Sequence, residues 1–129
     1  MFSQEQIHTV DGVQMVNTTP HEISFAVGDD VVSLPPSGVL INAKPVEKYA
    51  GTGPAGVFLV VPSFEADEEI TKKLEYFYQD HRDVVVVGSI IAAQAYPGLV
   101  FAMTPHPGFE RVAPAEKRMN PHKFSVYQK

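Results

Sequence analysis

The stretch from Asp83 to His106 constrains the fold of this chain most strongly, because it contains two long apolar runs. Val and Ile dominate the first run, Val84–Ala95, and β-branched residues favour strand over helix. The second run, Leu99–Met103, follows Tyr96-Pro97-Gly98, whose proline and glycine are typical of a tight turn. We therefore expect two central strands joined by this turn, with the rest of the chain packed against them.

The size and composition of the chain predict one globular domain over residues 1–129. A formal net charge of −5 argues against the clustered basic surface of a nucleic-acid-binding protein. Neither a run of transmembrane length nor a basic amphipathic helix is present, so we expect no membrane partner. The absence of cysteine excludes disulfides and thiolate metal ligands. The polar N-terminus lacks the apolar segment of a signal peptide, which predicts an intracellular, cytoplasmic protein.

Short apolar segments separated by turn residues predict further strands around the central pair. Ile23–Val27 and Val31–Leu34 flank Gly28-Asp29-Asp30, a pattern typical of a β-hairpin. Val57–Val61 has the composition of a buried strand, and the glycine-containing Lys48–Ala55 before it predicts an exposed loop.

One helix is predicted, over about residues 66–79. Ile70, Leu74 and Phe77 fall at i, i+4 and i+7 and form one apolar stripe, with Asp67 as the N-cap. The fold class is therefore α+β: a mostly antiparallel twisted sheet, or a partly closed barrel, of six or seven strands with this helix.

The polar terminal segments, 1–12 and 107–129, are expected to be extended arms, each able to add a strand to the sheet. Tyr76 and Tyr78 lie off the apolar stripe of the helix. An exposed aromatic face at these two residues would suit a contact between copies in a homo-oligomer.

The segment Val16–Ile23 reads Val-Asn-Thr-Thr-Pro-His-Glu-Ile. It resembles the first strand of a group of small bacterial and phage proteins without an assigned activity, which reads Val-Asn-Leu-Thr-Pro-His-x-Ile. Their Pro-Ser-Gly turn is similar to Pro36-Ser37-Gly38, and their Arg-x-Asp-Val-x-Val-Pro-Gly strand is similar to Arg82–Gly88. Their short Val-Ser strand and their closing Asp-Gly-x-Ile-x-Gly strand are matched loosely by Leu59–Ser63 and Pro97–Phe101.

This resemblance extends over residues 13–103 and implies a shared fold but no activity. The chain departs from the group at Thr18, where the group has leucine, and at Ile41-Asn42-Ala43, where the group has an arginine soon after its turn.

Polar residues at strand ends predict where a ligand would bind. Asn17, Thr19 and His21 form one polar segment, although Asn and Thr side chains also brace turns through backbone hydrogen bonds. Ser37 lies in a turn whose N–H groups suit an anion, and Arg82 suits a carboxylate or phosphate. These five residues are the candidate site for a small anionic ligand.

Histidines are the candidate catalytic residues. His21 and His106 each follow a Thr-Pro step, and imidazole serves both as an acid/base and as a metal ligand. Asp83 or Glu22 would orient such a histidine. The spacing matches no metal signature, so we expect no metal and no other cofactor, with His21 and His106 as the ligands if a metal does bind.

Two classes of function stay open. The preferred one is a non-catalytic binding or homo-oligomeric assembly protein that holds a small anionic ligand. The alternative is a small cofactor-free or metal-assisted enzyme, such as an isomerase, lyase or hydrolase, with a histidine acid/base. Convergence of His21, His106 and Arg82 on one pocket would favour the enzyme, and their separation would favour the assembly protein.

Overall fold

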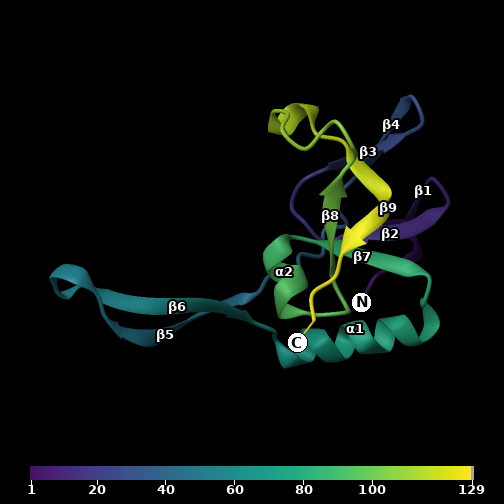
Figure 1. Cartoon of the computed structure of the whole chain (residues 1–129). Coiled ribbons are helices and arrows are strands. Elements are labelled where there is room, and N and C mark those ends of the chain that lie inside the picture. Colours follow the sequence, from purple (N-terminus) through teal and green to yellow (C-terminus); the bar gives the residue numbers. More distant parts are fainter. Residues whose placement is uncertain (129) are drawn as a thin grey trace.

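The computed structural model describes residues 1–128, and seven of the nine strands in this part of the chain form one mixed sheet that nearly closes as a barrel (Figure 1). The strands follow the order β1-β2-β7-β8-β9-β3-β4, and the two edge strands β1 and β4 approach each other. The α+β class is confirmed. The bounds are β1 (His8–Val10), β2 (Val13–Asn17), β3 (Ile23–Val27), β4 (Asp30–Leu34), β7 (Val84–Gly88), β8 (Phe101–Pro105) and β9 (Met119–Ser125).

Parallel and antiparallel pairings are equally frequent in this sheet, so it is mixed, whereas the sequence predicted mostly antiparallel pairs. The pairs β1–β2, β3–β4 and β8–β9 are antiparallel, and the pairs β2–β7, β7–β8 and β3–β9 are parallel. The predicted hairpin is confirmed as β3–β4, in which Ile23 lies opposite Leu34 and Gly28 adopts a positive φ of 58° in the turn. Parallel neighbours need a crossover connection, which helices provide here.

The central strand β7 is buried on both faces, which explains its uninterrupted run of valines. Val84 and Val86 pack in the core between the sheet and the helices, and Val87 packs in a second core inside the curved sheet. Val86 and Val87 are both 0% exposed. Strand β7 therefore connects the two halves of the hydrophobic core.

The apolar run that begins at Val84 does not continue as one strand to Ala95. Strand β7 ends at Gly88, and helix α2 (Ile90–Ala95) begins after Ser89, whose Oγ accepts a hydrogen bond from the N–H of Ala92. The predicted strand is wrong beyond Gly88, because an N-cap serine and an alanine-rich segment favour helix there. The same helix carries the chain across, so β8 pairs with β7 in parallel and not as a hairpin.

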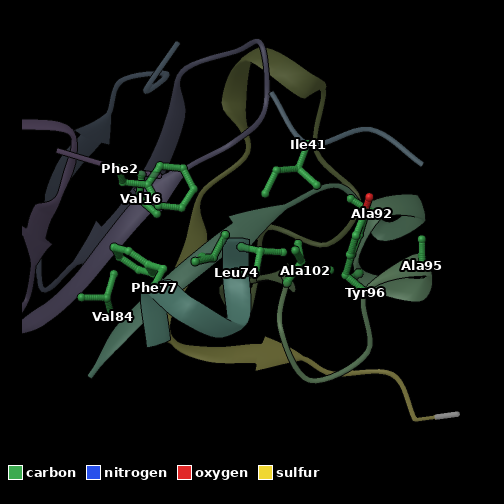
Figure 2. Close-up of a cluster of buried hydrophobic side chains, with 13 residues drawn as sticks. Phe2, Val16, Ile41, Leu74, Phe77, Val84, Ala92, Ala95, Tyr96 and Ala102 are labelled. Carbon is green, nitrogen blue, oxygen red and sulfur yellow. The ribbon is translucent and has the colours of Figure 1, made fainter. Parts of the chain in front are cut away.

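Helix α1 (Glu68–Asp80) agrees with the predicted main helix, and Asp67 is its N-cap. The Asp67 carboxylate accepts hydrogen bonds from the N–H groups of Glu69 and Ile70 at 2.9 and 3.2 Å. Leu74 and Phe77 face the core beneath the sheet, as Figure 2 shows.

Each terminal segment adds a strand to the sheet, so the added strand is confirmed and the extended arm is not what forms. Phe2 is buried against Phe77 with ring centroids 5.1 Å apart, η1 (Gln4–Gln6) follows it, and β1 forms one edge. In the C-terminal segment, η3 (Pro114–Glu116) precedes β9, which lies inside the sheet between β8 and β3. Lys129 lies outside the described residues.

A second, two-stranded sheet projects from the body of the molecule (Figure 1). It consists of β5 (Lys44–Thr52) and β6 (Phe58–Glu65), joined by η2 (Pro54–Gly56), and we call it the arm, Lys44–Glu65. The sequence predicted an exposed loop over Lys48–Ala55, most of which is β5. It also predicted a buried strand over Val57–Val61, and these five residues are exposed.

In residues 1–128 no helix combines the length and the apolar character needed to cross a membrane.

The two helix tyrosines differ in environment. Tyr76 is 70% exposed, as predicted, but Tyr78 is half-buried and packs against the core, so the two do not form one exposed face. The Tyr78 hydroxyl donates to the carbonyl of Leu99 at 2.8 Å and accepts from the N–H of Val86 at 3.2 Å. Burial raises the pKa of Tyr78 to about 12, against the smaller opposing effect of the Val86 N–H.

We expect Tyr78 to contribute to alkaline unfolding. The unfolded state loses the tyrosine proton near pH 10, and the folded state holds it to about pH 12. The contribution of Tyr78 to stability is therefore fully present below pH 10 and is lost as the pH rises from 10 to 12. The two pKa units correspond to a loss of about 2–3 kcal/mol. Urea denaturation at several pH values from 9 to 12 should show a smaller loss for Tyr78→Phe than for the wild type. Equal losses would contradict this assignment.

Candidate functional site

The predicted polar segment after β2 is a structural clamp built around Asn17, which is 0% exposed. The Asn17 amide nitrogen donates to the carbonyls of His21 and Leu34 at 2.8 and 3.2 Å. Its side-chain oxygen accepts from the N–H and the hydroxyl of Thr19 at 2.9 and 2.7 Å. The Asn17 amide group therefore joins the end of β2 to the end of β4, and its hydrogen-bonding groups are all engaged within the chain.

Ser37 is engaged in the same clamp. Its N–H and its hydroxyl both donate to the backbone carbonyl of Asn17, at 2.9 and 2.6 Å. The neighbouring Thr18 hydroxyl donates to the carbonyl of Val87 at 2.7 Å, which ties the segment to β7. Thus the structure does bring Asn17, Thr19 and Ser37 together, but their polar groups bond to the backbone and to one another.

Arg82 lies away from this clamp, so the five predicted ligand residues do not converge. Arg82 and Asp83 precede the first residue of β7, whereas Asn17 pairs with Val87 near the last one. The three steps along the strand from Val84 to Val87 alone span about 10 Å. Both Arg82 and Asp83 are exposed, and within residues 1–128 no ion pair joins them at the helix-to-strand corner.

The histidines do not form a catalytic or metal-binding group. The His21 ring is exposed, and it is the backbone of His21 that takes part in the clamp: its carbonyl accepts from Asn17 and Thr19, and its N–H donates to the Thr19 hydroxyl. The His106 ring contacts the carbonyl of Pro107 at 3.1 Å and the ring of Phe109. Among residues 1–128 no three His, Asp or Glu side chains are grouped as metal ligands. Of the residues named for an enzyme, His21 and Glu22 line one cavity, and His106 and Asp83 are not part of its lining.

A cavity of about 380 Å³ lies next to the clamp, where β2 and β7 end and β3 and β9 begin. Its size falls in the range of small-molecule pockets. Sequence spacing could not have revealed it, because its walls come from four separate segments. We call it the Met103 cavity, and its lining is Thr19, Pro20, His21, Glu22, Ile23, Ser24, Ser89, Met103, Pro114, Ala115, Lys117 and Met119.

The arm exposes a run of large apolar side chains. The exposed fractions are 62% for Tyr49, 79% for Phe58, 45% for Leu59, 44% for Val60 and 55% for Val61. From Tyr49 to Phe64 the chain carries no charged residue. A lone two-stranded ribbon is only marginally stable in water, and large exposed apolar patches are common at surfaces that bind a partner.

The register of the arm separates its two faces. Tyr49 lies opposite Val60, and Glu47 lies opposite Pro62, on the face that carries Phe58. The rings of Tyr49 and Phe58 pack edge to face with centroids 6.1 Å apart. We call this surface, Glu47, Tyr49, Thr52, Phe58, Val60 and Pro62, the aromatic face of the arm.

Two prolines limit how another strand can pair with the arm. Pro45 lies in β5 and Pro62 lies in β6, two steps apart along the ladder of paired residues. Neither proline has an N–H to donate. Prolines at strand edges interrupt edge-to-edge pairing. The faces of the arm are therefore better suited to binding than its edges.

Comparison with protein-family models, curated proteins and solved structures gives no match for this chain.

The clamp generates a prediction about stability. Asn17→Ala removes the side-chain partner of the buried Leu34 carbonyl and of the part-buried Thr19 N–H, at about 1–3 kcal/mol for each group left unsatisfied. We expect the free energy of unfolding to fall by about 2–4 kcal/mol, measured by urea denaturation. His21→Ala is the matched control, because the bonds at residue 21 use its backbone, and its effect should stay within about 0.5 kcal/mol. A larger effect of His21→Ala than of Asn17→Ala would contradict the role of the amide.

Proposed function

We propose that this chain is a non-catalytic, homo-oligomeric assembly protein whose arm binds a second copy. The carrying observation is the exposure of Val57–Val61, a segment with the composition of a buried strand, on a ribbon that projects from the body. Burying these side chains in a neighbouring copy would remove their apolar surface from water, at about 25 cal/mol for each Å².

A second copy is the partner favoured by the area of the arm. Strand β5 has nine residues, so the ribbon is roughly 30 Å long and about 10 Å wide, and one face covers on the order of 300 Å². A standard interface buries about 800 Å² on each partner. In a symmetric assembly, each copy both inserts its own arm and receives the arm of a neighbour. The surface buried on each copy therefore comes closer to this size.

The enzyme alternative has less support. It requires His21, His106 and Arg82 to line one pocket, and of these three only His21 lines the Met103 cavity in the part of the chain described. No carboxylate within residues 1–128 bonds to the His21 ring, so the oriented histidine of an acid/base mechanism is missing.

We expect Phe58→Glu to convert the oligomer to a monomer, because it places a charge in the centre of the proposed contact. Tyr76→Glu is the matched control, since Tyr76 is a similarly exposed aromatic residue on α1 and is the contact that the sequence alone suggested. Light scattering after gel filtration, with native mass spectrometry, measures the subunit number. Both variants should keep the wild-type circular dichroism spectrum, because neither side chain is buried.

Two outcomes would contradict the proposal. One is a wild-type protein that remains monomeric throughout a concentration series. The other is an oligomer that survives Phe58→Glu and dissociates with Tyr76→Glu, which would move the interface to the helix.

A further inference from the structure

We infer that the arm of one copy docks in the Met103 cavity of another copy, with Phe58 and Tyr49 in the cavity and Glu47 facing Lys117. This inference rests on the proposed function and adds the receiving surface. Both features lack a partner within residues 1–128: an apolar projection that contacts the body only near its root, and an apolar cavity on the body.

The lining of the cavity suits aromatic side chains. Met103 and Met119 are half-buried in its wall, and Ile23 is buried behind them. Methionine side chains adapt to irregular shapes and make favourable contacts between sulfur and aromatic rings. The edge-to-face pair of Tyr49 and Phe58 is the kind of large, ordered anchor that fills an interface pocket.

The charges of the two surfaces complement each other. The outer arm, from Tyr49 to Phe64, is uncharged, which suits an apolar interior. Glu47 is on the aromatic face and, within the described chain, forms no ion pair. Lys117 lines the cavity, and its ammonium group donates to the carbonyl of Glu110 at 3.5 Å and forms no ion pair within residues 1–128. Glu22 is the carboxylate in the lining of the cavity. On the arm, the nearest cation to Glu47 along the chain is Lys48, which lies on the opposite face.

The position of the arm favours a neighbour's cavity over its own. In Figure 1 the arm extends away from the body, whereas β3, β8 and the loop containing η3, which contribute to the cavity, lie elsewhere on the body. Arm and cavity are therefore different surfaces that meet head to tail. Such a contact closes either as a reciprocal dimer or as a ring.

A complementation experiment tests the inference. Phe58→Glu removes the arm contact and keeps the cavity, and Ala115→Glu blocks the cavity at an exposed lining residue and keeps the arm. Each variant alone should be monomeric by native mass spectrometry. An equimolar mixture should form a hetero-dimer, because the intact arm of one variant finds the intact cavity of the other. An arm-to-arm contact would not be blocked by Ala115→Glu, which would then assemble alone.

A charge exchange tests the pairing of Glu47 with Lys117. Glu47→Lys and Lys117→Glu should each raise the dissociation constant of the oligomer at least tenfold, and the double variant should return it to within about threefold of the wild type. Glu75→Lys, a charge reversal at an exposed residue of α1 outside the arm and the cavity, serves as the control and should leave it within that same range.

The outcomes separate this inference from the proposed function. Loss of assembly with Phe58→Glu, together with unchanged dissociation constants for Ala115→Glu and Lys117→Glu, would overturn the cavity and leave the assembly proposal standing. Assembly that survives Phe58→Glu would overturn both. A small molecule retained by the assembled wild type and lost with Ala115→Glu would overturn the docking of the arm, because it would occupy the same space.

Discussion

The burial of β7 on both of its faces is the constraint on which the rest of this structure depends. A strand with core on each side must be covered by helices on one face and by the curved sheet on the other. Helices α1 and α2 cover the first face, and β1, β3 and β4 curve around the second. Gly88 at the end of β7 shows how close this packing is, because a Cβ there would lie 2.5 Å from a methyl group of Val100.

The Asn17 clamp completes this arrangement at the end where the parallel strands finish. The buried side-chain amide of Asn17 joins β2 to β4, and the backbone carbonyl of Asn17 holds the turn at Ser37. Residues that are polar, near a turn and at a strand end look alike in a sequence whether they bind a ligand or brace the backbone. The difference lies in the hydrogen-bond partners, and here those partners belong to the chain itself.

The sequence correctly predicted the elements whose sequence signals lie within a few neighbouring residues. The β3–β4 hairpin has its glycine turn, and α1 has its apolar stripe and its Asp67 cap. The prediction that the strand continues past Gly88 was wrong, because in the sequence the long valine run outweighs the short capping signal of Ser89. Arg82 was grouped with the clamp because sequence gives no register, and only the pairing of Asn17 with Val87 separates them. The prediction for Val57–Val61 identified the strand and was wrong about its burial, since composition alone does not show whether the rest of the chain covers a strand.

The chain order of the arm and the cavity determines when they become available during synthesis. The arm is complete at Glu65, before the ribosome has made Met103, Lys117 and Met119. A nascent chain therefore presents an apolar ribbon while β7, β8 and β9 are still missing, and exposed surface of this kind promotes aggregation. A cavity on a finished copy could cover that ribbon early, so existing protein would assist the folding of new protein.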